Sequence, residues 1–293
     1  MGSVGELGST MRVLRPEPGL LAFYDGRIDG VRLHSAAPNW LDDGAFGLGT
    51  CTYALVEGDD ALVYDTHISL GHARIIRRTL AEAGARRIRV VLSHWHVDHV
   101  AGNEVFADCE IIAHRLTAET LLAHRAELEN GDPPVRPLAM PGTTYEERLE
   151  LRVGSKVAEL RHADVHSLDG TVLVLPDRDL ILAGDTLEDP ITYVVEPARL
   201  ETHLAGLERM AGWAIGRILP NHGAPERIAT GGYGPGLIEV TRHYVEKLLR
   251  SRTEPALRQP DLRGFMPEAF AAGTIVYHPA YEAVHRRNLA AVA

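Results

Sequence analysis

Residues 93–103 contain four side chains that can bind a metal ion within six consecutive positions: His94, His96, Asp98 and His99. The residues just before them, 88–92, are mostly apolar and β-branched, which predicts a short buried strand. Because side chains alternate along an extended chain, His94 and His96 are expected on the same side. A helix that begins near Asp98 would direct Asp98 and His99 toward the same point. The spacing therefore predicts a site that holds metal.

The pattern His-x-His-x-Asp-His after a strand resembles the signature of the metallo-β-lactamase superfamily. Four other segments resemble that family's motifs. They are an apolar strand that ends in Asp65, His166 followed by Ser-Leu-Asp-Gly, an apolar strand followed by Gly184 and Asp185, and a strand with a Pro-x-His-Gly turn that contains His222. A single His-x-His would be weak evidence, whereas five segments in order over residues about 50–225 form a specific match.

The resemblance implies a centre with two metal ions. A first ion would be held by His94, His96 and His166, a second by Asp98, His99 and His222, and Asp185 would bridge the two. Imidazole and carboxylate ligands without a thiolate suit zinc, and also manganese or iron(II), so we expect two Zn²⁺ per chain. Asp65 is not a ligand in the family and is interpreted as a group that fixes the metal loop through hydrogen bonds.

The third ligand segment leaves one alternative open. His162 could take the ligand position in place of His166, but the Ser-Leu-Asp-Gly that follows His166 favours His166. The remaining histidines, including His67, are expected in surface or hydrogen-bonded structural roles. Trp95 would point away from His94 and His96 on an extended loop, so core packing is expected for it. The two cysteines are too few for a disulfide framework and are expected to be reduced.

The implied reaction is hydrolysis of a small-molecule substrate. Bound metal lowers the pKa of water from about 15.7 toward 7, so a metal-bridging hydroxide could attack a polarised carbonyl carbon at neutral pH. Asp98 is the expected catalytic residue, because it could orient that nucleophile and move its proton. We expect a small ester, thioester, lactone or amide as substrate. Tyr193 follows Asp185 closely and could donate a hydrogen bond to substrate, although packed or rim roles are more usual for tyrosine.

Two other functions stay open. An iron-dependent persulfide dioxygenase of the same superfamily would bind one iron through the positions that match His94, His166 and Asp185. The complete second set, Asp98, His99 and His222, favours two metals instead. A metal-free binding or regulatory protein on the same fold is the other alternative, and the presence of every ligand argues against it.

The pattern of elements predicts an α+β fold, a four-layer αββα sandwich with a C-terminal helical extension. Strands are predicted over residues 51–57, 61–65, 149–153, 156–162, 171–175, 179–184 and 216–219, and helices over 70–83 and 197–212. The Gly-Asp-Asp at 58–60 indicates a hairpin. In such a sandwich the metal site lies at the edges of the sheets, where the loops converge.

Three regions are expected along the chain. Residues 1–10 resemble an added leader ahead of a natural start at Met11, residues 11–230 form the metallo-β-lactamase-like domain, and residues 231–293 form a helical extension packed on it. The extension carries an apolar stripe at helical spacing and could pack on the core, cover the pocket or form a homodimer contact. Residues 131–144 are rich in proline and glycine, which breaks any regular element and leaves either a surface connection or a flap over the metal loop.

Composition excludes several classes of partner. The chain of 293 residues has a formal net charge of −10, which argues against a general affinity for nucleic acid or an anionic membrane. Its apolar runs are shorter than the roughly 18 residues of a membrane helix. The first ten residues lack the basic and apolar regions of a signal peptide, so we expect a cytoplasmic protein.

Overall fold

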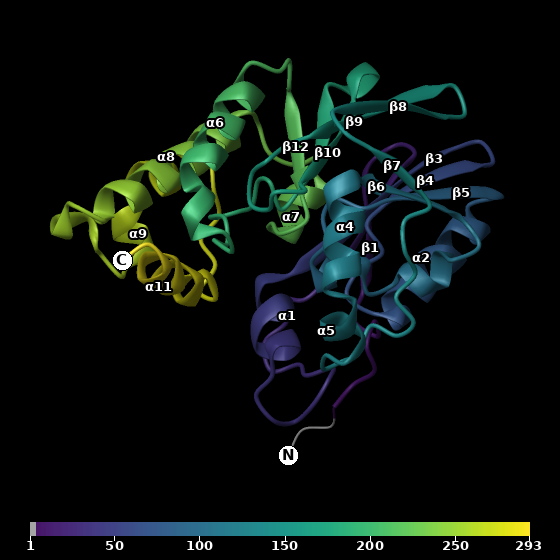
Figure 1. The fold of residues 1–293 in the computed structure, drawn as a ribbon, viewed down its shortest axis with the longest axis horizontal. Coiled ribbons are helices and arrows are strands. Elements are labelled where there is room, and N and C mark those ends of the chain that lie inside the picture. The colour runs from purple at the N-terminus through teal and green to yellow at the C-terminus, as the bar shows by residue number, and fades with distance from the viewer. Residues whose placement is uncertain (1–3) are drawn as a thin grey trace.

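The computed structural model describes residues 4–293 and shows two β-sheets with helices on both outer faces (Figure 1). The inner faces of the two sheets pack against each other, and each outer face packs against helices. The predicted four-layer αββα sandwich is therefore confirmed, with further helices at the C-terminal end of the chain.

The first sheet has seven strands that lie side by side in chain order. The strands from β1 to β4 are antiparallel neighbours, and those from β4 to β7 are parallel neighbours. A turn at Gly58 and Asp59 joins β3 to β4 and pairs Glu57 with Asp60, as the sequence predicts. The bounds are β1 (Arg12–Glu17), β2 (Leu20–Asp25), β3 (Thr50–Glu57), β4 (Asp60–Tyr64), β5 (Arg87–Val91), β6 (Glu110–His114) and β7 (Thr143–Tyr145).

The second sheet has five strands in the order β12-β11-β10-β9-β8. The neighbours from β8 to β11 are antiparallel, and β11 and β12 are parallel. The bounds are β8 (Arg148–Val153), β9 (Lys156–His162), β10 (Thr171–Leu175), β11 (Leu180–Gly184) and β12 (Arg217–Pro220). All five strands lie within one or two residues of the predicted ranges, which is the usual uncertainty at the end of an element.

Alternation along the strands separates the core into layers. In β4, Leu62 and Tyr64 pack between the two sheets, whereas Ala61 and Val63 face the outer helices. Both faces of β4 are buried, so residues 61–64 form an apolar run without a polar face.

The outer face of the first sheet is covered by α2 (Leu70–Glu82), α4 (Arg115–Ala123) and α5 (Arg125–Glu129). These helices contribute Ile76, Leu121 and Leu128 to the core on that side. Helix α6 (Leu200–Ala211) covers the second sheet. The short helical segments are η1 (Leu41–Ala45), α1 (Phe46–Leu48), α3 (Val97–Val100), η2 (Asn103–Phe106), η3 (Pro176–Arg178), η4 (Pro197–Arg199), α7 (Pro225–Ala229), η5 (Pro255–Leu257), α9 (Leu262–Phe265) and α10 (Pro267–Ala271).

The C-terminal helices α8 (Gly236–Ser251) and α11 (Tyr281–Ala291) gather with α6 on the outer side of the second sheet (Figure 1). Tyr244 and Leu248 of α8 and Tyr281 of α11 belong to the same buried cluster as Leu207 of α6. The apolar stripe of the extension is thus core packing. Within residues 4–293 no helix is both long enough and apolar enough to cross a bilayer.

The prediction that residues 131–144 contain no regular element was wrong at its end. Thr143 and Thr144 begin β7, a parallel edge strand in which Thr144 pairs with Ala113 of β6. A three-residue strand is too short to carry an alternating pattern, and Pro141 and Gly142 directly before it obscured the β-branched residues that follow. Strands β1, β2 and β6 were not predicted either.

Candidate metal centre

The predicted metal ligands lie on loops that meet where the strands end. Residues 94–99 follow β5, and α3 begins within this loop as predicted. Asp185 follows β11, His222 follows β12, and His166 lies in the connection between β9 and β10. Because β4 and β5 are parallel neighbours, as are β11 and β12, the loops after each pair emerge at the same edge of their sheet.

The side chains form two groups that share one residue. Within each group the potential ligand atoms all lie within 4.8 Å of one another. The first group is His94, His96, His166 and Asp185, and the second is Asp98, His99, Asp185 and His222. These groups coincide with the two ligand sets that the resemblance implies, and Asp185 is the residue expected to bridge them.

Asp185 Oδ2 lies among four imidazoles from both groups. Its distances to Nε2 atoms are 3.7 Å to His94, 3.6 Å to His166, 3.2 Å to His99 and 3.3 Å to His222. Asp98 completes the second group, with Oδ1 at 3.6 Å from Nε2 of His99 and Oδ2 at 3.3 Å from Nε2 of His222. A single carboxylate oxygen therefore lies close to candidate ligands of both groups.

Gly184 permits this position of Asp185. It has a φ of +58°, which residues with a side chain rarely adopt, and a Cβ atom there would lie 2.9 Å from the Cβ of Ser93 and 3.0 Å from the Tyr64 hydroxyl. The close approach of β11 to the start of the metal loop thus requires glycine.

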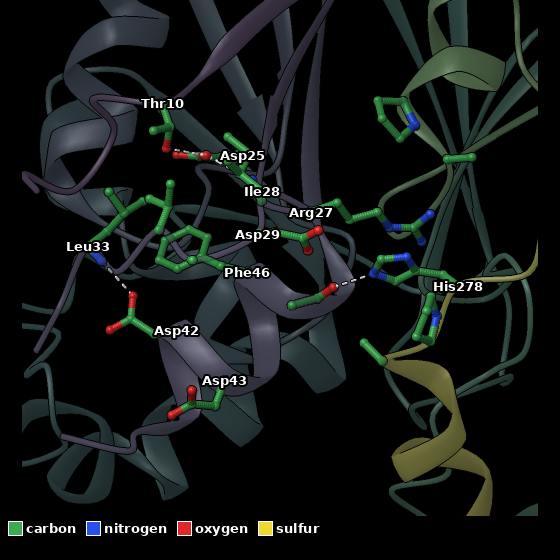
Figure 2. A pocket seen from close by; sticks show the side chains of 18 of the residues that line it. Thr10, Asp25, Arg27, Ile28, Asp29, Leu33, Asp42, Asp43, Phe46 and His278 are labelled. Carbon is green, nitrogen blue, oxygen red and sulfur yellow. Dashed lines mark hydrogen bonds between the residues drawn. The ribbon is translucent and has the colours of Figure 1, made fainter. Parts of the chain in front are cut away.

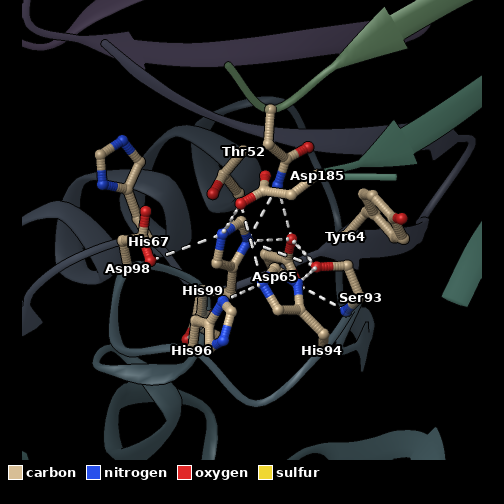
Figure 3. Close-up of polar contacts among 12 residues, drawn as sticks. Thr52, Tyr64, Asp65, His67, Ser93, His94, His96, Asp98, His99 and Asp185 are labelled. Carbon is tan, nitrogen blue, oxygen red and sulfur yellow. Dashed lines mark hydrogen bonds and ion pairs between the residues drawn. The ribbon is translucent and has the colours of Figure 1, made fainter. Parts of the chain in front are cut away.

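Asp65 ties the metal loop to its surroundings, as its interpretation from the sequence predicts (Figure 3). Its carboxylate accepts hydrogen bonds from the backbone N–H and the hydroxyl of Ser93 at 2.6 and 2.7 Å and from the Asn221 amide at 2.6 Å. It also lies 2.9 Å from Nδ1 of His99. A proton on that nitrogen leaves Nε2 of His99 free to face Asp185, which is how carboxylates commonly orient metal-binding histidines.

Other ligands are oriented in the same way. Nδ1 of His222 lies 2.6 Å from the carbonyl oxygen of Gly49, and Nδ1 of His94 lies 2.9 Å from the Ser93 hydroxyl. In both residues Nε2 is the nitrogen that faces Asp185. His166 has a φ of +68°, a strained conformation that the surrounding fold holds in place.

Burial and charge set the protonation of the site. Burial raises the pKa of Asp98, but His99 and His222 outweigh it and bring the pKa to about 2. Burial likewise lowers the pKa of His99 and His222, and the facing carboxylates reverse this and raise both well above the usual value. Burial lowers the pKa of His166 to about 3. Because imidazoles bind metal in their neutral form, metal ions would compete with protons for His99 and His222.

The donor set fits divalent cations. Oδ1 of Asp185 is buried, and no described residue donates a hydrogen bond to it. Within residues 4–293 no lysine or arginine forms an ion pair with Asp98 or Asp185. Two buried carboxylates without a lysine or arginine partner favour the binding of a cation among them. Metal binding remains a prediction that this arrangement supports.

His162 lies outside both groups. Its Nε2 lies 2.8 Å from the Leu168 carbonyl oxygen, and its ring stacks on His114 with the ring centres 4.1 Å apart. The structure thus brings His166, and not His162, to the other ligands. Trp95 is half-buried against the core beneath α4 and stacks on His124, and both cysteines are free.

A cavity of about 360 Å³ opens over the ligands. Its floor is lined by five of the candidate ligands, His96, Asp98, His166, Asp185 and His222. Tyr193 lines a wall, so the predicted substrate-contact residue does reach the site. Its half-buried ring packs against the Arg287 guanidinium, 4.7 Å from the ring centre.

Glu188 is a cavity residue that sequence reasoning did not single out. It is buried, its Oε1 accepts a hydrogen bond from the Tyr193 backbone N–H at 2.7 Å, and the same oxygen lies 3.6 Å from Nδ1 of His166. Burial, followed by the charge of Asp185, raises its pKa to about 8. The sequence feature that could have identified Glu188 is its position three residues after Asp185.

The loop at residues 26–49 forms a wall that the sequence analysis overlooked. Trp40, Ala45 and Leu48 line the cavity, whereas no residue of 131–144 does. Residues 131–144 support the wall from outside, because the Trp40 indole N–H donates to the Asp132 carbonyl oxygen at 2.6 Å. The structure therefore favours the surface-connection interpretation of 131–144. The length of loop 26–49 and its tryptophan were the signals for a functional role.

A second, larger cavity of about 640 Å³ is lined in part by the same loop (Figure 2). Phe46 and Asp42 line it, and so do Arg27 and His278, but none of the metal-ligand candidates does. Arg27 Nε donates to the Leu48 carbonyl oxygen at 2.7 Å. Residues 42–48 thus contribute side chains to both cavities.

A family model described as the metallo-beta-lactamase superfamily matches residues 46–262. The chain belongs to this superfamily. Solved metallo-β-lactamases share its fold at low sequence identity. The enzyme from Pontibacter korlensis has a TM-score of 0.62 at 15% identity over 80% of this chain and 99% of that one. The DIM-1 metallo-β-lactamase has a TM-score of 0.61 at 15% identity over 83% and 99%.

Curated relatives match part of the chain. It is 30% identical over 176 residues to the lactamase-like protein ptaB of Pestalotiopsis fici, covering 60% of this chain and 50% of that protein. It is 28% identical over 179 residues to the atrochrysone carboxyl ACP thioesterase AgnL7 of Paecilomyces divaricatus, covering 60% and 51%. The chain thus spans about half the length of these relatives. Membership of the metallo-β-lactamase superfamily, together with the two histidine-carboxylate groups, supports a metal-dependent hydrolase.

Proposed function

We propose that this protein is a hydrolase with two zinc ions per chain that cleaves a small ester, thioester, lactone or amide. The observation that carries the proposal is the position of Asp185 Oδ2, which lies within 3.2–3.7 Å of imidazoles from both ligand groups. A shared carboxylate reduces the repulsion between two neighbouring cations, so the geometry suits two ions better than one.

The zinc ions, Asp98 and Asp65 would have different roles in the reaction. Bound zinc ions supply an activated water and a Lewis acid for the carbonyl oxygen. Asp98 lines the cavity and is held ionised beside His222, so it can accept and return a proton at the floor of the site. Asp65 keeps His99 and the metal loop in place through its hydrogen bonds.

The relatives favour acyl chemistry for this site. One is named a carboxyl ACP thioesterase, which denotes hydrolysis of a thioester, and another is named a lactamase-like protein. Because the chain matches only half of each, these names guide the choice of test substrates.

Metal analysis and turnover test the proposal together. The protein, purified without added metal, is examined by elemental analysis and then assayed with thioester, ester, lactone, β-lactam, phosphodiester and persulfide substrates. We expect close to two zinc ions per chain and hydrolysis of a carboxyl derivative that a chelator abolishes and zinc restores. A single tightly held iron with persulfide oxidation would replace the proposal with the dioxygenase alternative.

A further inference from the structure

The walls of the metal cavity are apolar and come from separate parts of the chain. Trp40 and Leu48 belong to the loop between β2 and β3, Val97 begins α3, and Tyr193 and Val195 belong to the segment after Asp185. At about 360 Å³ the cavity is near the small end of the ~300–1,000 Å³ typical of ligand pockets. The space beyond the candidate metal ligands is therefore lined by side chains that favour an apolar group.

The walls also lack positive charge. Among residues 4–293, no lysine or arginine lines this cavity. The ionisable groups in the lining are the candidate metal ligands, Glu188 and the Tyr193 phenol. Arg287 lies against the ring of Tyr193 but does not itself line the cavity. An anionic group away from the metal ions would thus meet apolar side chains and a carboxyl group, with no cation to replace its hydration.

We propose that the cavity selects substrates whose acyl part is uncharged and apolar, a class that excludes acyl groups with a remote carboxylate or phosphate. This inference rests on the proposed hydrolase function.

A matched pair of esters tests the inference. In p-nitrophenyl hexanoate and mono-p-nitrophenyl adipate the acyl chains have the same length, but adipate ends in a carboxylate. In both, water adds its oxygen to the acyl carbon, the ester C–O bond breaks, and the products are the carboxylic acid and p-nitrophenol. With the zinc-loaded protein we expect kcat/KM to be at least ~10-fold higher for the hexanoate.

A positive charge placed in the wall should reduce this preference. Val195 is half-buried, so the ammonium group in Val195→Lys can stay hydrated while it faces the cavity. We expect the ratio of kcat/KM, adipate over hexanoate, to rise at least ~10-fold in Val195→Lys. Val195→Met is the matched control of similar length without charge, and its ratio should stay near that of the unmodified protein. Leu122→Lys, on α4 at a residue 64% exposed, controls for added charge elsewhere.

The possible failures are distinguishable. If neither ester nor any other carboxyl derivative is hydrolysed by the zinc-loaded protein, the proposed function fails. If hydrolysis depends on zinc but adipate is cleaved as well as hexanoate, the hydrolase stands and the substrate class is overturned. An unchanged ratio in a folded, metal-loaded Val195→Lys would also overturn it. Should that variant fail to fold, Trp40→Lys with Trp40→Met as control gives the same test at a residue that is 44% exposed.

Discussion

The metal centre and a second cluster nearby use the same kinds of side chain in different settings. Asp164, Glu196 and His203 also place potential ligand atoms within 4.8 Å of one another. The difference lies in Arg199, which forms ion pairs with Asp164 and, at 3.3 Å, with Glu196. The second cluster already contains its cation, whereas the carboxylates of the metal centre have no arginine or lysine partner among the described residues.

This difference shows why residue type alone does not define a metal site. Both places contain histidine and carboxylate groups, but in the second cluster one guanidinium forms ion pairs with both carboxylates and so offsets their charge. Arg199 lies on η4 just before α6, and Glu196 accepts from the Leu168 backbone N–H at 3.2 Å. The second cluster therefore helps to hold the loop that carries His166.

The largest effect is expected from removing a ligand. His166→Ala should lose metal and all detectable hydrolysis, because it removes a ligand whose position the fold sets. Elemental analysis and the zinc-supplemented assay measure both. His162→Ala is the control and should keep its metal, since His162 bonds to a carbonyl oxygen outside the centre. Metal loss in His162→Ala with retention in His166→Ala would show that the third ligand was assigned wrongly.

The second-largest effect on activity is expected from Asp98→Asn. The amide keeps the shape but removes a negative ligand and a proton acceptor, and loss of such acid-base assistance costs ~10²–10⁴ in rate. We expect kcat to fall by at least ~10², with an unchanged circular dichroism spectrum. Near-normal turnover at saturating zinc would mean that Asp98 neither positions the nucleophile nor transfers its proton, and the two-metal mechanism would be abandoned.

A smaller effect is expected from Asp65→Asn. The new amide N–H₂ group would oppose the donors that Asp65 now accepts from, Ser93 and Asn221, and would leave His99 poorly oriented. Partners of metal ligands typically contribute ~10–100-fold to metal affinity or activity. Competition with a zinc chelator should reveal a loss in that range. Asp59→Asn, in an exposed ion pair with Arg87, should leave zinc affinity unchanged.

The smallest effect on activity is expected from Arg199→Met, which removes the cation of the second cluster. Two carboxylates would lose their partner, so the free energy of unfolding should fall by ~1–3 kcal/mol while the metal centre stays filled. Added zinc should recover part of that stability, measured as a rise in Tm. Arg242→Met, which breaks exposed pairs with Glu239 and Glu246, should cost at most ~1 kcal/mol. Suppose that Arg199→Met loses no more free energy of unfolding than Arg242→Met and that added zinc does not raise its Tm. The charge of Arg199 would then not explain the difference between the two clusters.

Much of the centre could be predicted because its ligands lie in short motifs. The apolar strand before His94 and the Gly-Asp after β11 are local patterns, and each fixes where a ligand leaves its strand. The cavity could not be predicted in this way, because its walls are single residues in irregular segments. Trp40 reaches the site only because the loop before β3 folds across the sandwich, where its indole bonds to Asp132.

The C-terminal helices give a second example. Asn288 on α11 is fully buried, accepts from the Val194 backbone N–H at 3.0 Å and donates to the Thr192 carbonyl oxygen at 2.8 Å. These bonds fix the backbone on both sides of Tyr193. An asparagine in an amphipathic stretch carries no local sign of such a role, since its partners lie about 95 residues away in sequence.

The sequence by itself determined the family, the four-layer sandwich and the set of side chains that could hold metal, because strand periodicity and ligand spacing are local properties of the chain. Only the tertiary structure decided which histidine of the third segment joins the centre, which carboxylates lack an internal cation, and which side chains enclose the substrate. Those outcomes depend on contacts between loops far apart in sequence, and their geometry follows from how the two sheets pack against each other.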